Sequence, residues 1–204
     1  MALDPADYKR QTMHAYDGLA AEVVPGFDDF FETYARLEAD HFLARLDPGG
    51  MILDLGCGPG SASRYFAGKG YAPVSADLSE AMVKECKRRG LDNVIRLDLE
   101  ALPFRHGSLD AIWAHTSLLH VPKARLTRAL EGLKRTLRPG GAIFIALIQG
   151  DGEGYQGQPG IERWFSYFRV GEFESYILEG LTVVRRSQIE RKSVTFLGVH
   201  LRNR

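Results

Sequence analysis

The sequence predicts an α/β protein with a doubly wound, Rossmann-like sheet, arranged in three α/β/α layers. Short apolar runs such as "MILDL" and "LDAIWAHT" alternate with amphipathic stretches such as "SEAMVKECKRRG". An order of strand, helix, strand, helix requires parallel crossovers, whose right-handed connections place helices on both faces of the sheet. The chain has 204 residues and is 45% hydrophobic and 25% charged, as expected of a globular protein with a substantial core.

The elements are expected in the following order along the chain. Two helical stretches, residues 6–23 and 27–46, form an N-terminal lid or edge. Buried strands follow at residues 51–55, 72–78, 93–99, 109–116 and 141–149. The helices between them, which end at Gly or Pro-Gly, are expected at residues 61–70, 79–90 and 124–141.

The pattern changes after the fifth strand. A glycine-rich loop, "GDGEGYQGQPG", leads into the aromatic stretch "IERWFSYFRVGEFESYILEG", in which we expect a helix on the substrate side. The runs "LTVVRRSQIE" and "KSVTFLGVHLRN" are strands joined closely through Arg191 and Lys192. This spacing predicts an antiparallel hairpin at the end of the sheet.

Charge and composition favour a small partner. Lys plus Arg equals Asp plus Glu at 26 each, so no net field attracts the protein to nucleic acid or to an anionic membrane. The N-terminal "MALDPADYKR" has no signal-peptide pattern, and no apolar run approaches the roughly 20 residues of a membrane span, so we expect a cytoplasmic protein. Cys57 and Cys86 lack metal-ligand spacing and are expected to be reduced thiols.

The stretch "LDLGCGPGSAS" marks the expected ligand crevice, because ligands of such sheets bind at the carboxyl ends of the strands. Gly56, Gly58 and Gly60 let the backbone turn tightly and let a ligand approach it closely. Ser61 occupies the position of the third glycine of a dinucleotide fingerprint, which disfavours a diphosphate. Asp54, two residues before the turn, suits a ligand with a cationic amino group.

The ends of the next two strands supply further candidates. Asp77 ends its strand and can accept both hydroxyls of a ribose, and Leu78 offers an apolar face to an adenine. Ser79 is the better N-cap of the following helix, which frees Asp77 for a ligand. Asp98 can accept from an adenine amino group while Leu99 packs on the ring.

Together these segments resemble the class I S-adenosylmethionine-dependent methyltransferases, in the branch that modifies small molecules. The resemblance covers roughly residues 40 to 150 and rests on the order and spacing of four motifs: "LDLGCGPG", "SADLSEAM", "RLDLEALPFRHGSLDAIWAHTSLLHVP" and "LKRTLRPGGAIFIAL". The segments "AYDGLA" and "ERWFSYF" are similar to flanking parts of the family more loosely.

The resemblance implies a seven-stranded sheet with an antiparallel last strand and one methyltransferase domain over residues 1–204. Its parts are a helical lid or edge (1–48), a cofactor-binding core (49–150) and a substrate-side loop, helix and C-terminal hairpin (151–204). The resemblance also implies that Asp54 and the glycine turn hold the methionine part of S-adenosylmethionine. It implies that Asp77 binds the ribose and that Asp98 and Leu99 border the adenine. The turn residues are Gly56, Cys57, Gly58 and Gly60.

Methyl transfer by in-line displacement needs a nucleophile held near the methyl carbon, and an O–H or N–H acceptor must also lose a proton. His115 and His120, which follow the fourth strand, are the catalytic candidates, and His115 also sits beside the expected methionine site. A hydrogen-bonded loop histidine is the alternative for each. His14 is a weaker candidate for the substrate side.

Substrate recognition is expected outside the cofactor core. Arg163, Trp164 and Tyr167 follow the glycine-rich loop and can clamp a planar or carboxylated substrate, with Tyr16 closing the pocket from the N-terminal side. Packing of these rings against the C-terminal strands is the alternative. Asp151 alone does not make a metal site, so no metal is expected. A nicotinamide-dependent oxidoreductase and a non-catalytic cofactor-binding module are the alternative functions, while oligomeric state and the methylated atom stay open.

Overall fold

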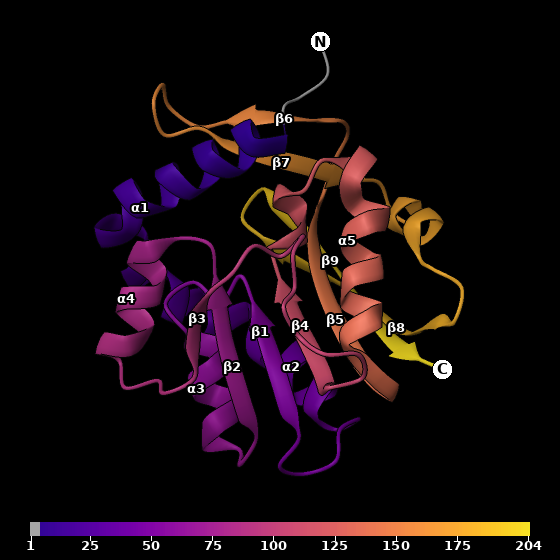
Figure 1. The fold of residues 1–204 in the computed structure, drawn as a ribbon. Coiled ribbons are helices and arrows are strands. Elements are labelled where there is room, and N and C mark those ends of the chain that lie inside the picture. Colours follow the sequence, from indigo (N-terminus) through magenta and orange to yellow (C-terminus); the bar gives the residue numbers. More distant parts are fainter. Residues whose placement is uncertain (1–4) are drawn as a thin grey trace.

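The computed structural model describes residues 5–204 as a nine-stranded sheet flanked by helices (Figure 1). Parallel strands form its centre in the order β3-β2-β1-β4-β5. They are β1 (Met51–Leu55), β2 (Ala72–Asp77), β3 (Val94–Arg96), β4 (Leu109–His115) and β5 (Leu137–Gln149). Each lies where the sequence predicts a strand, although β3 is shorter and β5 begins earlier.

The sheet continues from β5 through the C-terminal hairpin. β9 (Val194–Asn203) pairs antiparallel with β5 from Ala142 to Ile148, and β8 (Leu181–Arg191) pairs antiparallel with β9. Lys192 turns the chain between them with a φ of 52°. The predicted class, a doubly wound sheet with an antiparallel last strand, is therefore confirmed. Seven of the nine strands run in the order β3-β2-β1-β4-β5-β9-β8, and β6 and β7 are two strands beyond the seven expected.

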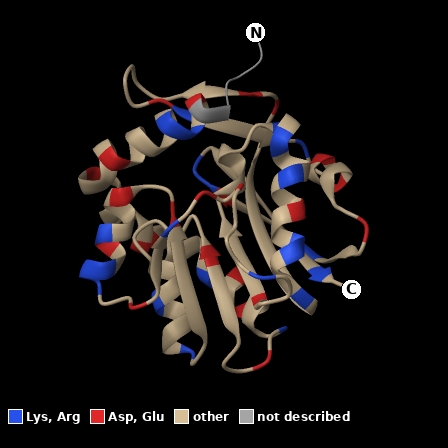
Figure 2. Cartoon of the chain, in the orientation of Figure 1, with Lys and Arg blue, Asp and Glu red and all other residues tan. Residues whose placement is uncertain are grey.

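Helices cover both faces of this sheet, which gives the three layers in Figure 1. α5 (Lys123–Thr136) lies in front of the strands, α2 (Arg36–Leu43) and α3 (Ser61–Gly68) lie behind them, and α4 (Glu80–Arg88) packs against β2 and β3 at the edge of the sheet. Ser79 caps α4 as predicted, since its Oγ accepts from the Met82 N–H at 3.2 Å. The charged segments in Figure 2 lie mainly on helices and loops, whereas the central strands are largely uncharged.

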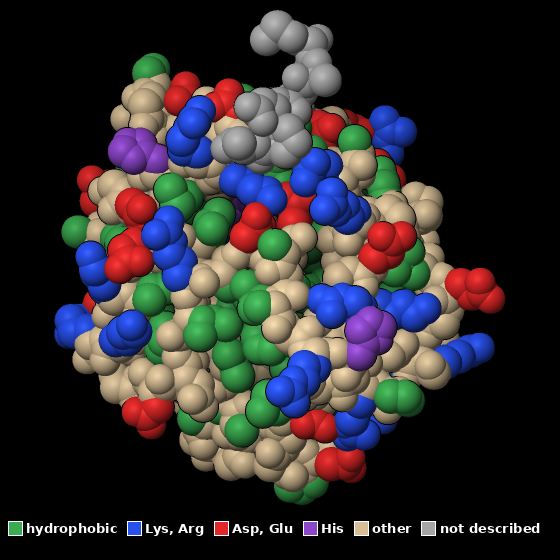
Figure 3. All heavy atoms as spheres, in the orientation of Figure 1, with side chains coloured by type: hydrophobic (Ala, Val, Ile, Leu, Met, Phe, Trp, Pro, Cys, Tyr) green, Lys and Arg blue, Asp and Glu red, His purple; other side chains and the backbone are tan. Residues whose placement is uncertain are grey.

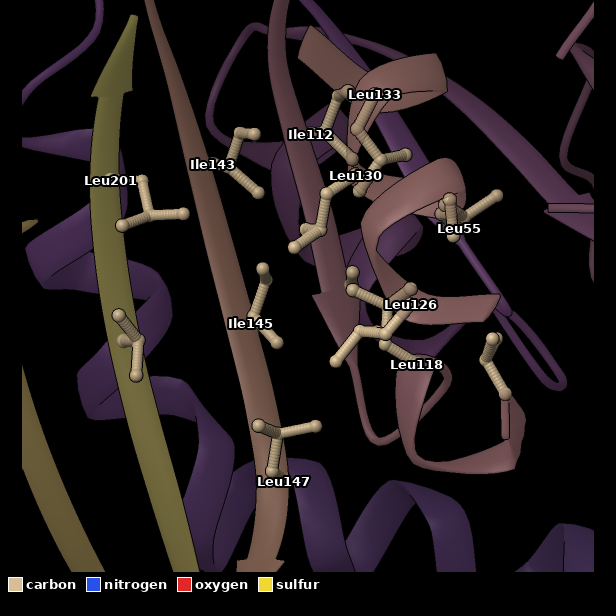
Figure 4. Packing of buried hydrophobic residues seen from close by; sticks show 14 of the residues in the cluster. Leu55, Ile112, Leu118, Leu126, Leu130, Leu133, Ile143, Ile145, Leu147 and Leu201 are labelled. Atoms are coloured by element: carbon tan, nitrogen blue, oxygen red, sulfur yellow. The ribbon is translucent and has the colours of Figure 1, made fainter. Parts of the chain in front are cut away.

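Alternation along each strand sends neighbouring side chains into two separate cores. In β1, Leu53 and Leu55 face the core under α5, while Ile52 faces the core under α2 and α3. Figure 4 shows the first core, where leucines of α5 pack on isoleucines of β4 and β5. The second core is rich in aromatic rings from both sheet and helices: Phe42, Phe66, Trp113 and Phe144.

Two segments differ from the sequence expectation. α1 (Pro5–Phe30) runs through Pro25 and continues as a π-helix (Phe31–Ala35) into α2, so the two N-terminal stretches form one continuous helical segment. Between residues 151 and 204, the expected helix is replaced by the hairpin of β6 (Glu153–Gln156) and β7 (Arg163–Phe168) and a short 3₁₀ helix, η3 (Glu172–Tyr176). In β7, Trp164, Ser166 and Phe168 are buried in alternation, a period of two that indicates a strand.

The β6–β7 hairpin and α1 lie together above the carboxyl ends of the parallel strands (Figure 1). β7 pairs with the last residues of β5, beyond the point where β4 ends. The Trp164 N–H donates to Thr12 Oγ1 at 3.0 Å, which ties β7 to α1. The fold thus places a two-part roof over the edge where the predicted site residues converge.

Candidate functional site

A pocket opens under α1 at the carboxyl ends of β1, β2, β3 and β4. The strands contribute the glycine turn and the residues that follow β2 and β3. The segment after β4 contributes residues through η2 (Leu118–His120), and α1 closes the opposite side. The predicted site residues that line this pocket are Tyr16, Gly56, Gly58, Asp77, Leu78, Asp98, Leu99 and His120.

The glycine turn has left-handed backbone at each alternate position, with φ of 72° at Gly56, 53° at Gly58 and 84° at Gly60. A side chain at Gly56 would meet Ser117 Cβ at 2.4 Å, and one at Gly60 would meet Leu91 Cδ1 at 2.3 Å. Packing within the protein therefore requires Gly56, whereas at Gly60 the end of the Leu91 side chain would have to move; positive φ adds strain for other residues at both positions. Gly60 faces α4 and does not line the pocket.

Asp77 links the glycine turn to the start of α4. Its Oδ2 accepts from the Gly58 N–H and its Oδ1 from the Ser79 N–H, both at 2.9 Å. Burial raises the pKa of Asp77 to about 6, although these backbone donors act in the opposite direction. Each oxygen keeps a free lone pair, so the carboxylate can still accept hydrogen bonds from a ligand.

Asp98, expected at the adenine, is already engaged. The Lys9 ammonium of α1 lies 2.7 Å from Asp98 Oδ2, and the Glu100 N–H donates to Asp98 Oδ1 at 2.9 Å. Lys9 also pairs with Glu100 at 2.6 Å, and Arg125 contacts the same buried carboxylate at 2.7 Å. This end of the pocket is thus closed by ion pairs from α1 and α5.

Asp54 and His115 point away from the pocket because strand alternation places them on the α2 and α3 side. Asp54 accepts from Ser63 Oγ of α3 at 2.6 Å, and burial raises its pKa to about 7. The His115 ring stacks on Trp113 and meets the edge of Phe30, and burial lowers its pKa to about 4. Neither side chain lines the pocket, in contrast to the sequence expectation.

Cys57 also faces inward from the turn. Its Sγ lies 3.7 Å from Cys86 Sγ, and both thiols donate to the Gly58 carbonyl. Both cysteines are free and buried. The side chain of Cys57 therefore packs the turn against α4, and only the neighbouring glycines of the turn face the ligand space.

Tyr16 and His120 meet across the pocket. The Tyr16 hydroxyl lies 2.9 Å from His120 Nε2, and the two rings are nearly perpendicular at 77°. His120 Nδ1 lies 2.6 Å from the Trp164 carbonyl of β7. Burial lowers the pKa of His120 to about 4 and raises that of Tyr16.

The other predicted substrate residues lie outside the pocket lining. The Arg163 guanidinium covers the Tyr16 ring at 5.1 Å and the Phe165 ring at 5.3 Å, which places it directly behind Tyr16. The Trp164 side chain is buried, and the Tyr167 ring stacks on Phe165. His14 is exposed, because two residues along a helix turn it by about 200° from Tyr16.

Sequence reasoning missed the face that α1 presents to the pocket. It consists of Tyr8, Lys9, Thr12, Met13 and Tyr16, joined at the far end of the helix by Phe27. Spacings of three and four residues bring side chains to one face of a helix, so the pattern around Tyr16 contained the signal.

Two residues after β4 were also missed. Thr116 has a left-handed φ of 55°, a rare conformation for a β-branched residue. The buried Ser117 Oγ finds no hydrogen-bond partner within residues 5–204. Both line the pocket, so an orphaned hydroxyl and a strained backbone lie side by side there. Within the same described residues, no group of three His, Cys, Asp or Glu side chains could hold a metal ion.

The glycine turn, the strand-end carboxylates and the sheet order can now be compared with known proteins. A family described as "Methyltransferase domain" matches residues 53–145, from β1 through most of β5. Over this segment the chain is similar to the methyltransferase family. The matched residues include the turn, Asp77, Asp98 and the segment after β4, but neither α1 nor the β6–β7 hairpin.

Relatives of the chain include O-methyltransferases. It is 32% identical over 152 residues to a malonyl-[acyl-carrier protein] O-methyltransferase of Enterobacter lignolyticus, a match that covers 73% of the chain and 57% of the relative. It is 34% identical to a ubiquinone biosynthesis O-methyltransferase of Xanthomonas oryzae pv. oryzae, covering 53% of the chain and 48% of the relative. The chain thus spans about half the length of these curated relatives.

A solved structure resembles the whole chain. It is the 1,6-didemethyltoxoflavin-N1-methyltransferase of Burkholderia thailandensis, with bound 1,6-didemethyltoxoflavin and S-adenosylhomocysteine. The TM-score is 0.80 at 19% identity, and the match covers 100% of this chain and 92% of the other. At this identity the likeness supports the fold of the chain alone, including the N-terminal helices and C-terminal hairpin that the family match leaves out.

Proposed function

We propose that the protein is an enzyme that transfers a methyl group from S-adenosylmethionine to a small-molecule acceptor, at oxygen or nitrogen. The observation that carries this proposal is the convergence in one pocket of the left-handed glycine turn, the Asp77 carboxylate and the unpartnered Ser117 hydroxyl. The similarity of residues 53–145 to the methyltransferase family supports it. One methyltransferase domain over residues 1–204 is part of the same proposal.

The residues of the pocket fit S-adenosylmethionine. Gly56 and Gly58 leave backbone exposed for the methionine part, and Ser117 Oγ offers a hydrogen bond that the protein does not use. Asp77 can accept from the ribose hydroxyls, and Leu78 and Leu99 provide apolar faces for the adenine. In place of direct recognition by Asp98 alone, we propose that Lys9 and Asp98 together border the adenine end, since they are already paired.

The cofactor supplies, when bound, a methyl group on a sulfonium sulfur. The protein contributes position and exclusion of water, because α1 and the β6–β7 hairpin roof the carboxyl edge of the sheet. The strained backbone at Thr116 holds Ser117 at the pocket wall, next to the end of β4. Of the two proposed catalytic histidines, His120 lines this pocket and is the one we retain.

On the substrate side, we propose that Tyr16 contacts the acceptor and that Arg163 orients an anionic or electron-rich part of it. The position of the guanidinium behind Tyr16 supports this, as does its Nε, which lacks a hydrogen-bond partner among the described residues. An acceptor contact made in ground and transition states alike acts mainly on KM. Arg163→Ala is therefore expected to raise KM with a smaller effect on kcat.

Calorimetric titration of the full chain with S-adenosylhomocysteine and, separately, with a nicotinamide dinucleotide tests the cofactor. We expect binding of S-adenosylhomocysteine alone, and binding of the dinucleotide alone would replace the proposal with a nicotinamide-dependent oxidoreductase. Turnover on a panel of small acceptors separates the enzyme from a non-catalytic cofactor-binding module, which would bind S-adenosylhomocysteine but methylate nothing.

Small metabolites, and neither nucleic acid nor membrane, are the proposed partners, and the cytoplasm is the proposed compartment. In support, Figure 3 shows Lys and Arg side chains interspersed with Asp and Glu over the face that it draws. The chain as a whole has a formal net charge of zero. Such a surface provides no steering of a long polyanion. Across residues 5–204, no helix is both long and apolar enough to cross a bilayer.

A further inference from the structure

The hydrogen bonds that join Tyr16, His120 and the backbone of β7 define one proton arrangement. The Trp164 carbonyl can only accept, so His120 Nδ1, 2.6 Å away, carries the proton. Burial keeps this imidazole neutral near pH 7, so Nε2 has a free lone pair. The Tyr16 hydroxyl, 2.9 Å from Nε2, therefore donates to it.

This arrangement fixes what Tyr16 offers to the pocket. Because its only proton points to His120, the phenolic oxygen has lone pairs alone to present to a ligand. A hydroxyl or an N–H group can donate to it, whereas a carboxylate would meet an oxygen that has no proton left to give. The Tyr16–His120 pair thus favours a methyl acceptor that can donate a hydrogen bond over one that can only accept.

Two charges face the pair. The Arg163 guanidinium comes from β7, with its central carbon 5.1 Å from the Tyr16 ring, and Asp77 stands at the end of β2. Arg163 lowers the pKa of Tyr16 and Asp77 raises it, both against a larger rise caused by burial. Arg163 lies closest to the phenol and stabilises negative charge that develops there.

Resting on the proposed function, we propose that Tyr16 and His120 form a proton relay, and that the acceptor is a small molecule methylated at an O–H or N–H group. A phenol, an enol or a ring N–H has this chemistry. Carboxylates are not preferred acceptors. The relay extends the separate roles suggested by the sequence, since it makes one functional unit of a helix α1 residue and a residue of η2.

The acceptor oxygen or nitrogen bonds to the methyl carbon, and the carbon–sulfur bond breaks with its electron pair left on sulfur. The acceptor's proton passes to the Tyr16 oxygen while the Tyr16 proton passes to His120 Nε2. The positive charge lost at sulfur is regained on the imidazole, so the net charge of the pocket is constant. His120 then releases the proton to water.

Nitrogen-15 NMR of the full chain saturated with S-adenosylhomocysteine tests the relay without turnover, using His120→Gln to identify the signals. We expect a protonated Nδ1 and an unprotonated Nε2 between about pH 6 and 8. Tyr16→Phe is expected to shift the Nε2 resonance and to leave Nδ1 nearly unchanged. An Nε2-protonated tautomer or an imidazolium at neutral pH would overturn the proposal.

Turnover of three probes of similar size, para-cresol, benzimidazole and benzoate, tests the acceptor class. We expect methylation of the phenol or the N–H probe and little of benzoate; preference for benzoate would overturn the inference. Tyr16→Phe and His120→Gln should each lower turnover about a hundredfold, and the double variant should fall no further, because the pair acts as a unit. The deficit should shrink as the pH approaches the pKa of the phenol, since a phenolate needs no relay.

Tyr155→Phe is the matched control, since Tyr155 lies on β6 beside Trp164 and outside the pocket lining. It should keep full turnover. Titration with S-adenosylhomocysteine distinguishes failure of the proposed function from failure of the relay alone. If the parent protein does not bind it, the proposed function fails; if parent and variants bind it and the variants keep full turnover, only the relay fails.

Discussion

The Gly58 N–H donates a hydrogen bond of 2.9 Å to the Asp77 carboxylate, so the turn after β1 is tied to the end of β2. The backbone N–H groups of Gly56 and Cys57 also donate to the Ala76 carbonyl, at 2.8 and 3.0 Å. One carboxylate therefore both shapes the glycine turn and faces the pocket. Removal of Asp77 affects two parts of the proposed cofactor site at once.

Asp77→Ala is expected to weaken binding of S-adenosylhomocysteine by about 2 kcal/mol, or about thirtyfold in Kd. The loss combines charge-assisted hydrogen bonds to the ribose with a looser turn. Isothermal titration calorimetry measures it, with the exposed Asp92→Ala as the control that should bind like the parent. Equal affinities for the two variants would contradict the assignment of the ribose to Asp77.

Cofactor affinity is expected to rise from about pH 5 to pH 7. Burial raises the pKa of free Asp77 to about 6, and ligand hydroxyls donate best to its ionised form. Below pH 6 a proton must leave before these bonds form, which costs up to tenfold in affinity per pH unit. Kd for S-adenosylhomocysteine measured across this range should show the rise in the parent and a flat profile in Asp77→Asn. A parallel rise in both would assign the titration to another group.

Gly56→Ala is expected to destabilise the fold more than Gly58→Ala. Both substitutions put a side chain on left-handed backbone, at about 1 kcal/mol each. At Gly56 the new Cβ would also lie 2.4 Å from Ser117 Cβ, whereas at Gly58 it would meet the movable Phe27 ring at 3.1 Å. Urea unfolding of both variants measures the difference. Equal free energies of unfolding for the two variants would show that Ser117, in the segment after β4, moves aside at little cost.

Local signals in the sequence were sufficient for the sheet and for the cofactor-facing turn. Each parallel strand is a short apolar run, Ser79 is a good N-cap, and the glycines alternate where φ is positive. The direction of His115 was also present in the sequence, because Ala111 and Trp113 precede it at intervals of two and face the same core. Its expected placement beside the cofactor followed instead from its position at the carboxyl end of the fourth strand.

The sequence contains no comparable local signal for contacts between residues that are far apart in the chain. Lys9 reaches Asp98 across 89 residues, and Tyr16 reaches His120 across 104. These pairs depend on how α1 crosses the sheet edge, which is set by packing rather than by any spacing in the chain. The aromatic stretch after residue 161 contains the strand β7 where a helix is expected, and Trp164, Ser166 and Phe168 are buried at a period of two, which is the signal of a strand.

Glu38 and His200, which are 162 residues apart, form another contact between distant segments, and this contact gives a prediction on stability. Glu38 of α2 is buried and accepts from His200 Nε2 of β9 at 2.7 Å and from Arg185 of β8 at 2.6 Å. Burial alone would raise the pKa of Glu38, but these two partners outweigh it and hold the pKa at about 2. The ionised carboxylate thus fastens the N-terminal helices to the C-terminal hairpin.

Glu38→Gln is expected to lower the free energy of unfolding at pH 7 by about 3 kcal/mol, because it leaves the Arg185 charge without its buried partner. The pKa of Glu38 is lower in the folded state than its ordinary value of 4.5, so its contribution is complete above about pH 4.5 and is lost as the pH falls towards 2. The difference between parent and variant should therefore shrink on acidification.

Glu32→Gln, which breaks the exposed pair with Arg36, is the control and should cost less than about 1 kcal/mol. Urea unfolding at several pH values measures both variants, and a pH-independent deficit in Glu38→Gln would mean that packing rather than charge fastens the hairpin.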